Sequence, residues 1–332
     1  MKNSVIKNDN QIILFNLIQK KLPANLALVD TVSDILGVGY DAVYRRMRGE
    51  KPISLEETIK LCRHFNISMN SFVSETHKTH IQCHYSPLHL DKLQDNLTFI
   101  QDMSENINNV KLIPGSEIIL SAVDIPLFNI FPYRELTLFK FFSWSKSMHG
   151  YAADYELFIK EIEHFDVLSY KYEKIVKGYQ LVPSSEIWMD NTIDTILRLL
   201  RYHFEMRHFS DEKTPLFLCE QLLDLINTLQ KWVEKGTKGE ENIPFKFYVS
   251  ETDIANTYIL FKNPDKSNCM VRLYTINALN IADEGFCKET EIWLQKSIQQ
   301  ATLISGASEI ERFKFFNAQR KKINDLIDKI QS

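Results

Sequence analysis

The chain has little glycine, proline or cysteine for its length. Glycine and proline number only 10 each among 332 residues, which favours long helices over a turn-rich all-β architecture. The cysteines are scattered, odd in number and without a Cys-x-x-Cys pair, so we expect no disulfide framework and predict a reducing, cytoplasmic setting. The five are Cys62, Cys83, Cys219, Cys269 and Cys287.

Long apolar runs are missing as well. No uninterrupted stretch approaches the roughly 20 apolar residues that a helix needs to cross a bilayer. Near the N-terminus the apolar run Ile12–Phe15 is cut by Asn16 and again by Gln19, so we expect no signal peptide. These patterns predict a soluble, intracellular protein without a membrane partner.

Signatures of catalysis are also absent from the sequence. There is no Gly-rich phosphate loop, no Gly-x-Ser-x-Gly and no His-Glu-x-x-His motif. Isolated carboxylate pairs such as Glu161 and Glu163 are typical of a solvated helix face. We therefore predict no enzyme, no catalytic residue and no cofactor, and keep an enzyme in residues 91–332 only as a third alternative.

Charge is nearly balanced overall but unevenly distributed. The formal net charge is −4, yet residues 1–75 hold 10 basic and 8 acidic side chains, which leaves 29 basic and 35 acidic side chains for the remainder. A slightly basic small domain joined to an acidic larger one suits DNA binding that is confined to one end of the chain.

Periodicity divides the chain into four parts. We expect a flexible arm at residues 1–10, short amphipathic helices over 11–73, a linker at 74–90 that contains Pro87, and a larger domain at 91–332.

The larger domain shows mostly helical spacing, and the apolar segment 116–131 stays unassigned. Alternating apolar and polar residues predict strands at 245–249, 257–261 and 270–276, with a hairpin turn at Asn263–Lys266. Helices are expected at 92–108, 133–148, 152–177, 186–208, 213–235, 286–304 and 308–330, the last opened by a capping box from Ser308 to Glu311. The predicted fold is therefore mainly α, with a small antiparallel β-sheet near 245–282.

The stretch 30–49 carries the clearest functional pattern. Thr31 and Asp34 have the spacing of a helix start, and Gly37 stands where a helix end needs a left-handed residue. A second helix is expected over about 40–48. Helix, glycine-containing turn and second helix is the helix-turn-helix arrangement, in which the second helix enters the major groove of DNA.

Flanking patterns extend this arrangement to five short helices. Ile12–Leu22 supplies the first helix, a capping box from Ser54 to Glu57 starts the fourth, and Met69–Phe72 supplies a short fifth. Within the second helix of the turn, Ala42, Val43 and Met47 form the apolar face.

Five helices in this order resemble the lambda-repressor-like (Cro-type) DNA-binding family over residues 11–73, under a quarter of the chain. The resemblance lies in Leu36-Gly37-Val38, Val43, Arg45, Gly49, Pro52-Ile53-Ser54-Leu55 and Phe65–Phe72. Ser33 and Gly39 depart from the family's usual small residue and Ser or Thr. Arg46 stands where the family often has an apolar residue, and Met47 is expected to take over the inward role. The register of the recognition helix is therefore open by one residue.

The family's geometry implies two sets of DNA contacts. The base-reading set is Tyr40, Asp41, Tyr44 and Arg45, because arginine pairs with guanine and aspartate accepts from cytosine. The phosphate-contacting set is Arg46, Arg48 and Lys51.

The whole chain also resembles a group of transcription regulators from Bacteroidetes, which implies a similar two-part layout. We predict a sequence-specific regulator that binds double-stranded DNA as a homodimer on an inverted repeat, because one small DNA-binding domain buries little DNA surface. The larger domain would dimerise and sense a small-molecule or protein effector. The alternative is a promoter-tethered scaffold whose larger domain recruits another protein.

Three weaker patterns leave choices open. His77, His80, Cys83, His84 and His89 are metal-ligand types, but the linker context and the lack of a second ligand pair lead us to predict no metal. The tryptophans line an effector pocket or belong to the core, and they are Trp144, Trp188, Trp232 and Trp293. The heptad-spaced residues of the last helix form a dimer seam or pack on their own domain, and they are Phe316, Ile323 and Ile330.

Overall fold

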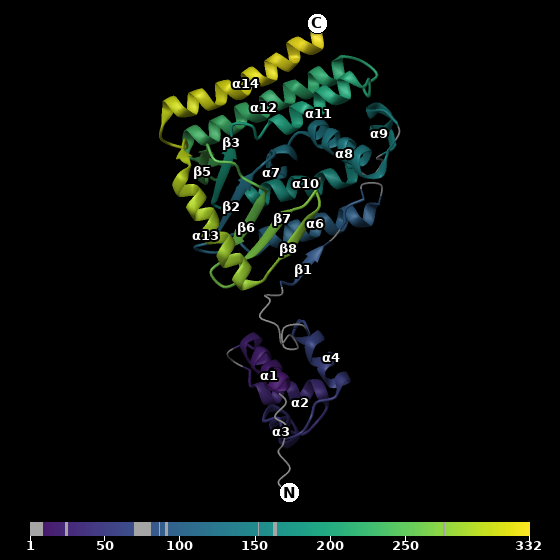
Figure 1. Cartoon of the computed structure of the whole chain (residues 1–332), viewed down its shortest axis with the longest axis vertical. Coiled ribbons are helices and arrows are strands. Elements are labelled where there is room, and N and C mark those ends of the chain that lie inside the picture. The colour runs from purple at the N-terminus through teal and green to yellow at the C-terminus, as the bar shows by residue number, and fades with distance from the viewer. Residues whose placement is uncertain are drawn as a thin grey trace. The chain divides into compact units, whose positions relative to one another are not determined.

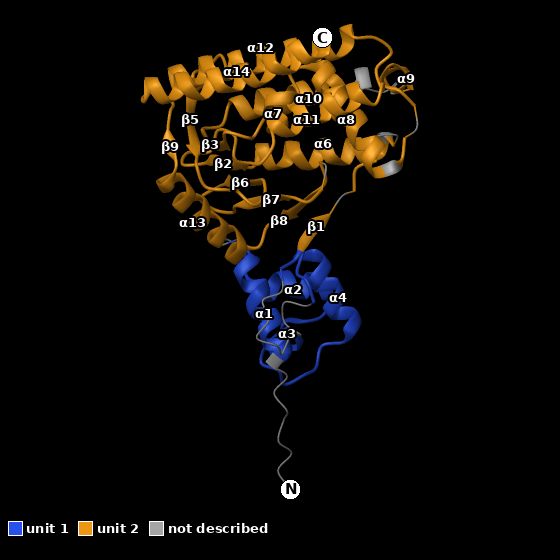
Figure 2. Cartoon of the chain, turned by 45° about the horizontal axis from the view of Figure 1, so that its top comes forward, with its two compact units in different colours: residues 1–82 blue, residues 83–332 orange. Residues whose placement is uncertain are grey.

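The computed structural model describes residues 9–23, 26–69, 81–85, 87–89, 92–151, 153–161, 165–274 and 276–332. Contacts divide the chain into two compact units, Met1–Gln82 and Cys83–Ser332, which are coloured separately in Figure 2. Most of the predicted arm, the first part of the predicted linker and all but Met69 of the predicted fifth helix lie outside the described residues. In the part of the chain that is described, no helix combines the length and the apolar composition needed to cross a membrane.

The first unit is helical (Figure 1). Its described helices are α1 (Asp9–Lys21), α2 (Leu28–Leu36), α3 (Tyr40–Met47) and α4 (Leu55–His64). Each helix contributes one apolar stripe to a common core, whose most buried members are Leu14, Ile18, Val32, Val43 and Leu61. This core explains why short helices, which are marginal alone, are stable here.

The two predicted helix starts in the first unit have different outcomes. The capping box of α4 is confirmed, since the Glu57 amide donates to Ser54 Oγ over 3.1 Å and the Ser54 amide donates to Glu57 Oε2 over 3.0 Å. The start at Thr31 is wrong, because α2 begins earlier, at Leu28. The Thr31 hydroxyl instead donates to the Ala27 carbonyl over 3.1 Å, as a threonine inside a helix commonly does.

The second unit is built on a nine-stranded mixed sheet in the order β1-β8-β7-β6-β2-β3-β5-β4, with β9 also paired to β5. The strands are β1 (Cys83–Tyr85), β2 (Glu117–Ala122), β3 (Ser184–Met189), β4 (Thr237–Lys238), β5 (Ile243–Ser250), β6 (Tyr258–Lys262), β7 (Asn268–Arg272), β8 (Ala278–Ile281) and β9 (Thr302–Leu303). Strands β2, β3 and β5 run parallel in the centre, and every other pairing is antiparallel. Residues 83–85, expected in the linker, thus form an edge strand.

Helices cover the two faces of this sheet unequally. They are α6 (Leu93–Asn108), α7 (Leu127–Ile130), α8 (Arg134–His149), α9 (Tyr155–Glu161), α10 (Phe165–Gln180), α11 (Asp194–Glu205), α12 (Lys213–Lys235), α13 (Glu284–Gln300) and α14 (Glu309–Gln331). One face, with Leu120, Trp188 and Phe247, joins the large core beneath the other helices. The opposite face, with Ile119 and Ile187, packs with Leu294 of α13 (Figure 1).

The prediction of a mainly α fold with a small antiparallel sheet near 245–282 is therefore wrong. The most consequential of the strands that the prediction misses are β2 and β3, in the middle of the sheet, where both faces are covered by helices. Strands buried on both faces lack the alternation of apolar and polar residues that marks a half-exposed strand. For that reason the sequence pattern assigns no structure to the segment 116–131, and the predicted helix 186–208 combines the end of β3 with α11.

Further differences are local. The predicted helix 152–177 is two described helices, α9 and α10. Ser308 has a φ of +54° and makes no side-chain cap, so the capping box predicted there is wrong. Arg312 acts at this helix start instead, donating through Nη1 to the Ile304 and Ala307 carbonyls over 2.9 and 2.7 Å. The predicted hairpin turn at Asn263–Lys266 is confirmed between β6 and β7.

The heptad-spaced residues of α14 pack within their own unit. Phe316, Ile323 and Ile330 are buried in the large core, where α14 contacts α12 and α11. Of the tryptophans, Trp144 of α8 and Trp188 of β3 belong to the same core, where large aromatic side chains are often buried.

Candidate nucleic-acid interface

Helix α3 is oriented by a tight turn after α2. Gly37 adopts a φ of +64°, and its amide donates to the Ser33 carbonyl over 2.8 Å, which ends α2. The Ser33 hydroxyl donates to the Val38 carbonyl over 2.5 Å. Ser33 therefore stabilises the turn by a hydrogen bond that an alanine would lack.

The predicted base-reading residues share the solvent face of α3. Tyr40 and Tyr44 are 57% and 47% exposed, and Asp41 and Arg45 are also exposed. These positions are i, i+1, i+4 and i+5, which fall on one side of a helix with 3.6 residues per turn. Within the described residues, none of the four side chains takes part in a hydrogen bond or an ion pair, so all are available to a ligand.

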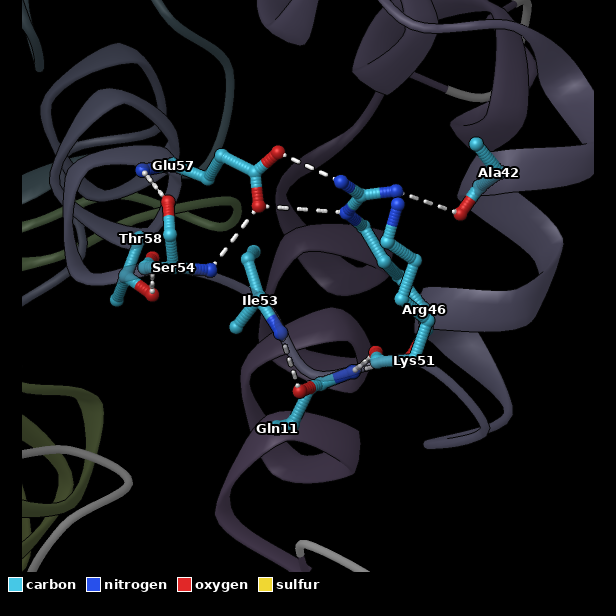
Figure 3. Close-up of polar contacts among 8 residues, drawn as sticks. All are labelled: Gln11, Ala42, Arg46, Lys51, Ile53, Ser54, Glu57 and Thr58. Atoms are coloured by element: carbon cyan, nitrogen blue, oxygen red, sulfur yellow. Dashed lines mark hydrogen bonds and ion pairs between the residues drawn. The ribbon is translucent and has the colours of Figure 1, made fainter.

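Arg46 lies on the opposite, buried face of α3. It is only 5% exposed, and its guanidinium donates to both carboxylate oxygens of Glu57, over 2.7 and 3.3 Å, and to the Ala42 carbonyl over 3.1 Å (Figure 3). The prediction that Arg46 contacts phosphate does not fit this placement, because the charge is turned inward and paired. The spacing could have revealed it, since Arg46 and Met47 follow Val43 at i+3 and i+4 on the same face.

Glu57 connects this ion pair to the start of α4. Burial opposes ionisation of the carboxyl, but hydrogen bonds from Arg46 and the Ser54 amide outweigh it, so the pKa of Glu57 lies below its ordinary value. One carboxylate thus closes the capping box and anchors α3 to α4.

Gln11 fixes the end of α3 from the side of α1. Its buried amide nitrogen donates to the carbonyls of Arg46 and Lys51 over 2.6 and 2.9 Å. Its amide oxygen accepts from the Ile53 amide over 2.9 Å (Figure 3). Nothing in the sequence marked Gln11, because the backbone groups that it bonds lie 35 to 42 positions away, at the end of α3 and in the loop after it. These three bonds hold the loop after α3 against the helical core.

Two of the predicted phosphate contacts remain at the surface. Arg48 and Lys51 are exposed, and Arg48 forms a two-point pair with Glu50, with distances of 2.6 and 3.0 Å. That hydrogen bonding raises the pKa of Arg48 and lowers the pKa of Glu50. An exposed pair of this kind contributes little to stability, so Arg48 can exchange Glu50 for a phosphate oxygen.

The histidine-rich segment gives no metal site among the described residues. His77 and His80 lie outside the described residues. Cys83 and His84 are exposed on β1, and His89 Nδ1 lies 2.6 Å from an Asp95 carboxylate oxygen.

The comparisons with known proteins add no assignment to this geometry. No protein-family model, curated protein or solved structure matches the chain.

Proposed function

We propose that the first unit reads double-stranded DNA through α3 and that the chain is a sequence-specific transcription regulator. The observation that carries the proposal is the division of α3 into two faces. Val43 and Arg46 fix one face in the unit, and the opposite face presents the unpaired Tyr40, Asp41, Tyr44 and Arg45.

The exposed side chains suit the edges of base pairs. An α-helix fits the major groove, where arginine donates two hydrogen bonds to guanine and aspartate accepts from the amino group of cytosine. Arg45 and Asp41 supply these two chemistries. Tyrosine hydroxyls form hydrogen bonds either to bases or to the DNA backbone, so Tyr40 and Tyr44 would orient the helix in the major groove.

The loop after α3 supplies the electrostatic part of the interaction. Arg48 and Lys51 are the exposed cations nearest the end of the helix, and Gln11 holds the backbone that carries Lys51. Phosphate contacts position a protein on DNA without reading its sequence. Arg46 is not part of this proposal.

We also propose that the chain acts as a homodimer on an inverted repeat. A single recognition helix of eight residues reaches only a few base pairs, and two-fold dimers place two such helices about one helical turn apart.

A protein-interaction scaffold is the second candidate. It is favoured by Ile310 and Phe313, which are exposed three residues apart on α14, since exposed apolar side chains that lie together mark contact surfaces. Light scattering on the full chain and on an Ile310→Ser, Phe313→Ser variant separates the two candidates. A wild-type dimer that becomes monomeric assigns this surface to self-association, whereas a monomeric wild type with a co-purifying protein that the variant loses favours the scaffold.

Selection of bound sequences from a random duplex pool tests the DNA-reading proposal. The full-length wild type is compared with Arg45→Ala and with Arg63→Ala, a control that removes an exposed arginine from α4. We expect the wild type and Arg63→Ala to enrich one palindrome, and Arg45→Ala to lose the preference at one position in each half-site. Failure of all three proteins to enrich any sequence at moderate salt would contradict the proposal.

A further inference from the structure

The second unit contains a small cavity between α7 and α12, which we call the α7–α12 cavity. It measures about 90 Å³ and is partly open to solvent. Its described lining comes from α7, the turn between α7 and α8, the end of α10 and the second half of α12. Both α10 and α12 contact α7, so the cavity lies in the helical layer of this unit (Figure 1).

Asn129 of α7 brings a buried acceptor to this cavity. The residue is 5% exposed, and among the described residues none donates a hydrogen bond to its amide oxygen, Oδ1. Buried acceptors in folded proteins are nearly always satisfied by protein, water or a ligand, because an unpaired one costs free energy. Asn129 is part of the cavity lining, so the missing donor is expected there.

Hydrogen bonds in the core fix the direction of the Asn129 amide. Its Nδ2 donates to the Glu186 carboxylate, with distances of 3.3 and 3.5 Å to the two oxygens. Glu186 also accepts from the Tyr179 hydroxyl and, over 2.7 Å, from Trp188 Nε1, so a donor suits its remaining side. Glu186 does not belong to the described lining. The amide nitrogen therefore faces the core, which leaves the amide oxygen for the side of the cavity.

The other walls combine an apolar surface with a second amide. Leu225, Leu229 and Trp232 of α12 supply the apolar part. Gln180 is half-buried, and within the described residues its side chain makes no hydrogen bond, so its amide can donate to a ligand carbonyl. No charged side chain belongs to the described lining. An uncharged ligand is favoured, because a charged one would lose its hydration without gaining a counter-charge.

The volume limits the ligand to a small group. A cavity of about 150 Å³ holds a benzene molecule, and drug-sized ligands need about 300 Å³ or more. The α7–α12 cavity is smaller than both but partly open. It therefore suits a compact molecule of about six non-hydrogen atoms, part of which can extend toward solvent.

We propose that the α7–α12 cavity binds a small uncharged amide, whose N–H donates to Asn129 Oδ1 and whose carbonyl accepts from the Gln180 side chain. Its apolar body would lie against Leu229 and Trp232. The proposal concerns the second unit alone and does not depend on DNA reading. A ketone of the same shape would keep the carbonyl contact but leave Oδ1 without a donor.

Nuclear magnetic resonance of the full-length chain, without DNA, tests the proposal with 2-pyrrolidinone as the amide probe. Cyclopentanone is its counterpart, since it has the same ring and carbonyl with CH₂ in place of N–H. The readout is the indole N–H signal of Trp232, which Trp232→Phe identifies among the signals of the four tryptophans. We expect 2-pyrrolidinone to shift this signal to saturation, with a midpoint concentration about tenfold lower than that of cyclopentanone, because only the amide satisfies Oδ1. Absence of a saturable shift with 2-pyrrolidinone, or equal midpoints for the two probes, would overturn the proposal.

Two variants and a control assign the contacts. Asn129→Leu removes the acceptor at similar volume and should make the two probes bind equally. Gln180→Leu removes the donor to the carbonyl, so it should weaken both probes alike and keep the ratio of their midpoints near tenfold. Lys231→Gln replaces an exposed lysine beside Trp232 and should behave as the wild type does.

Circular dichroism checks the folding of each variant. If Asn129→Leu does not fold, the wild-type ratio and the Gln180→Leu affinities decide the question. A tenfold ratio that persists in folded Asn129→Leu, or affinities that Gln180→Leu leaves unchanged, would place the probe elsewhere and overturn the assignment.

Discussion

The two units bury charge in different ways. In the first unit, Arg46 meets one carboxylate, Glu57, and backbone carbonyl and amide groups complete the hydrogen bonds of both side chains. In the second unit, one carboxylate, Asp124, serves both Lys140 and Arg272. The first arrangement is balanced, and it fixes a helix. The second places two cations on one buried carboxylate at the lining of a cavity beside β2 in the larger unit.

Removal of the shared carboxylate should have the largest effect. Asp124→Asn keeps the acceptor for the Ile125 amide but removes the negative charge that Lys140 and Arg272 share, so the free energy of unfolding of the second unit should fall by about 3–5 kcal/mol. Urea denaturation followed by tryptophan fluorescence measures the loss, because all four tryptophans lie in this unit. Asp265→Asn, in the exposed turn between β6 and β7, is the matched control and should behave as the wild type.

Removal of the balanced carboxylate should cost less, because Glu57 is partly exposed. Glu57→Gln should lower the stability of the first unit by about 2 kcal/mol, since Arg46 stays buried without a counter-charge. Hydrogen exchange at the amides of α3 and α4 reports this unit separately.

A double variant sharpens this result. Replacing Arg46 with Met as well should restore part of the loss, because an apolar side chain suits the buried face of α3. If Glu57→Gln alone leaves exchange unchanged, Arg46 is not held as described.

Mild acid should lower the stability of the second unit more than that of the first. Burial, with the nearby charges of His208 and Lys146, lowers the pKa of His203 from 6.5 to about 4. The unfolded chain therefore takes up a proton near pH 6.5 that the folded chain accepts only near pH 4. The second unit should lose stability as the pH falls through that interval, and the loss should be complete near the lower value.

Chemical denaturation across this pH range checks the expectation. His203→Gln should flatten the pH dependence of the stability of the second unit, although it also changes the hydrogen bond with Ser143. The first unit has a lowered carboxyl pKa at Glu57, so its stability from that group should decline only at lower pH, as the carboxylate becomes protonated. A profile of the second unit that is unaltered in His203→Gln would be contrary to this account.

The smallest expected effect is at Arg48. Arg48→Ala should weaken binding to all duplexes alike and reduce the slope of log affinity against log salt by about 1, as the loss of one phosphate contact does. The Arg46→Met, Glu57→Gln double variant removes a buried arginine instead and should leave the slope unchanged. Equal slopes for wild type and Arg48→Ala would remove Arg48 from the interface.

The sequence pattern predicts correctly those features that depend on residues close together in the chain. The limits of α3 and α4, the left-handed Gly37 and the capping box of Ser54 follow from neighbours within one or two helical turns. The inward position of Arg46 was also present in the spacing, but the charge of the residue outweighed it in our interpretation. Gln11 could not be found in this way, because its partners, Arg46 in α3 and Lys51 and Ile53 after it, lie 35 to 42 positions away in the chain.

Long-range pairing explains the failure in the second unit. Ile118 pairs with Ser184, and Ser184 pairs in turn with Phe245, so each central strand depends on a partner more than 60 residues away. A local window sees only a short apolar run, which is compatible with helix or strand. The cavity beside β2 has the same origin, since Asp124 and Arg272 are separated by 148 positions and meet only through the sheet.

The most direct measurement of the central claim is the binding of the full-length chain to its selected palindrome and to a random duplex, followed by fluorescence anisotropy. Arg45→Ala should lower the affinity for the palindrome by about 1–3 kcal/mol and barely change the affinity for the random duplex, while Arg63→Ala changes neither. Equal affinities of wild type and Arg45→Ala for the palindrome would contradict the claim that the exposed face of α3 reads DNA.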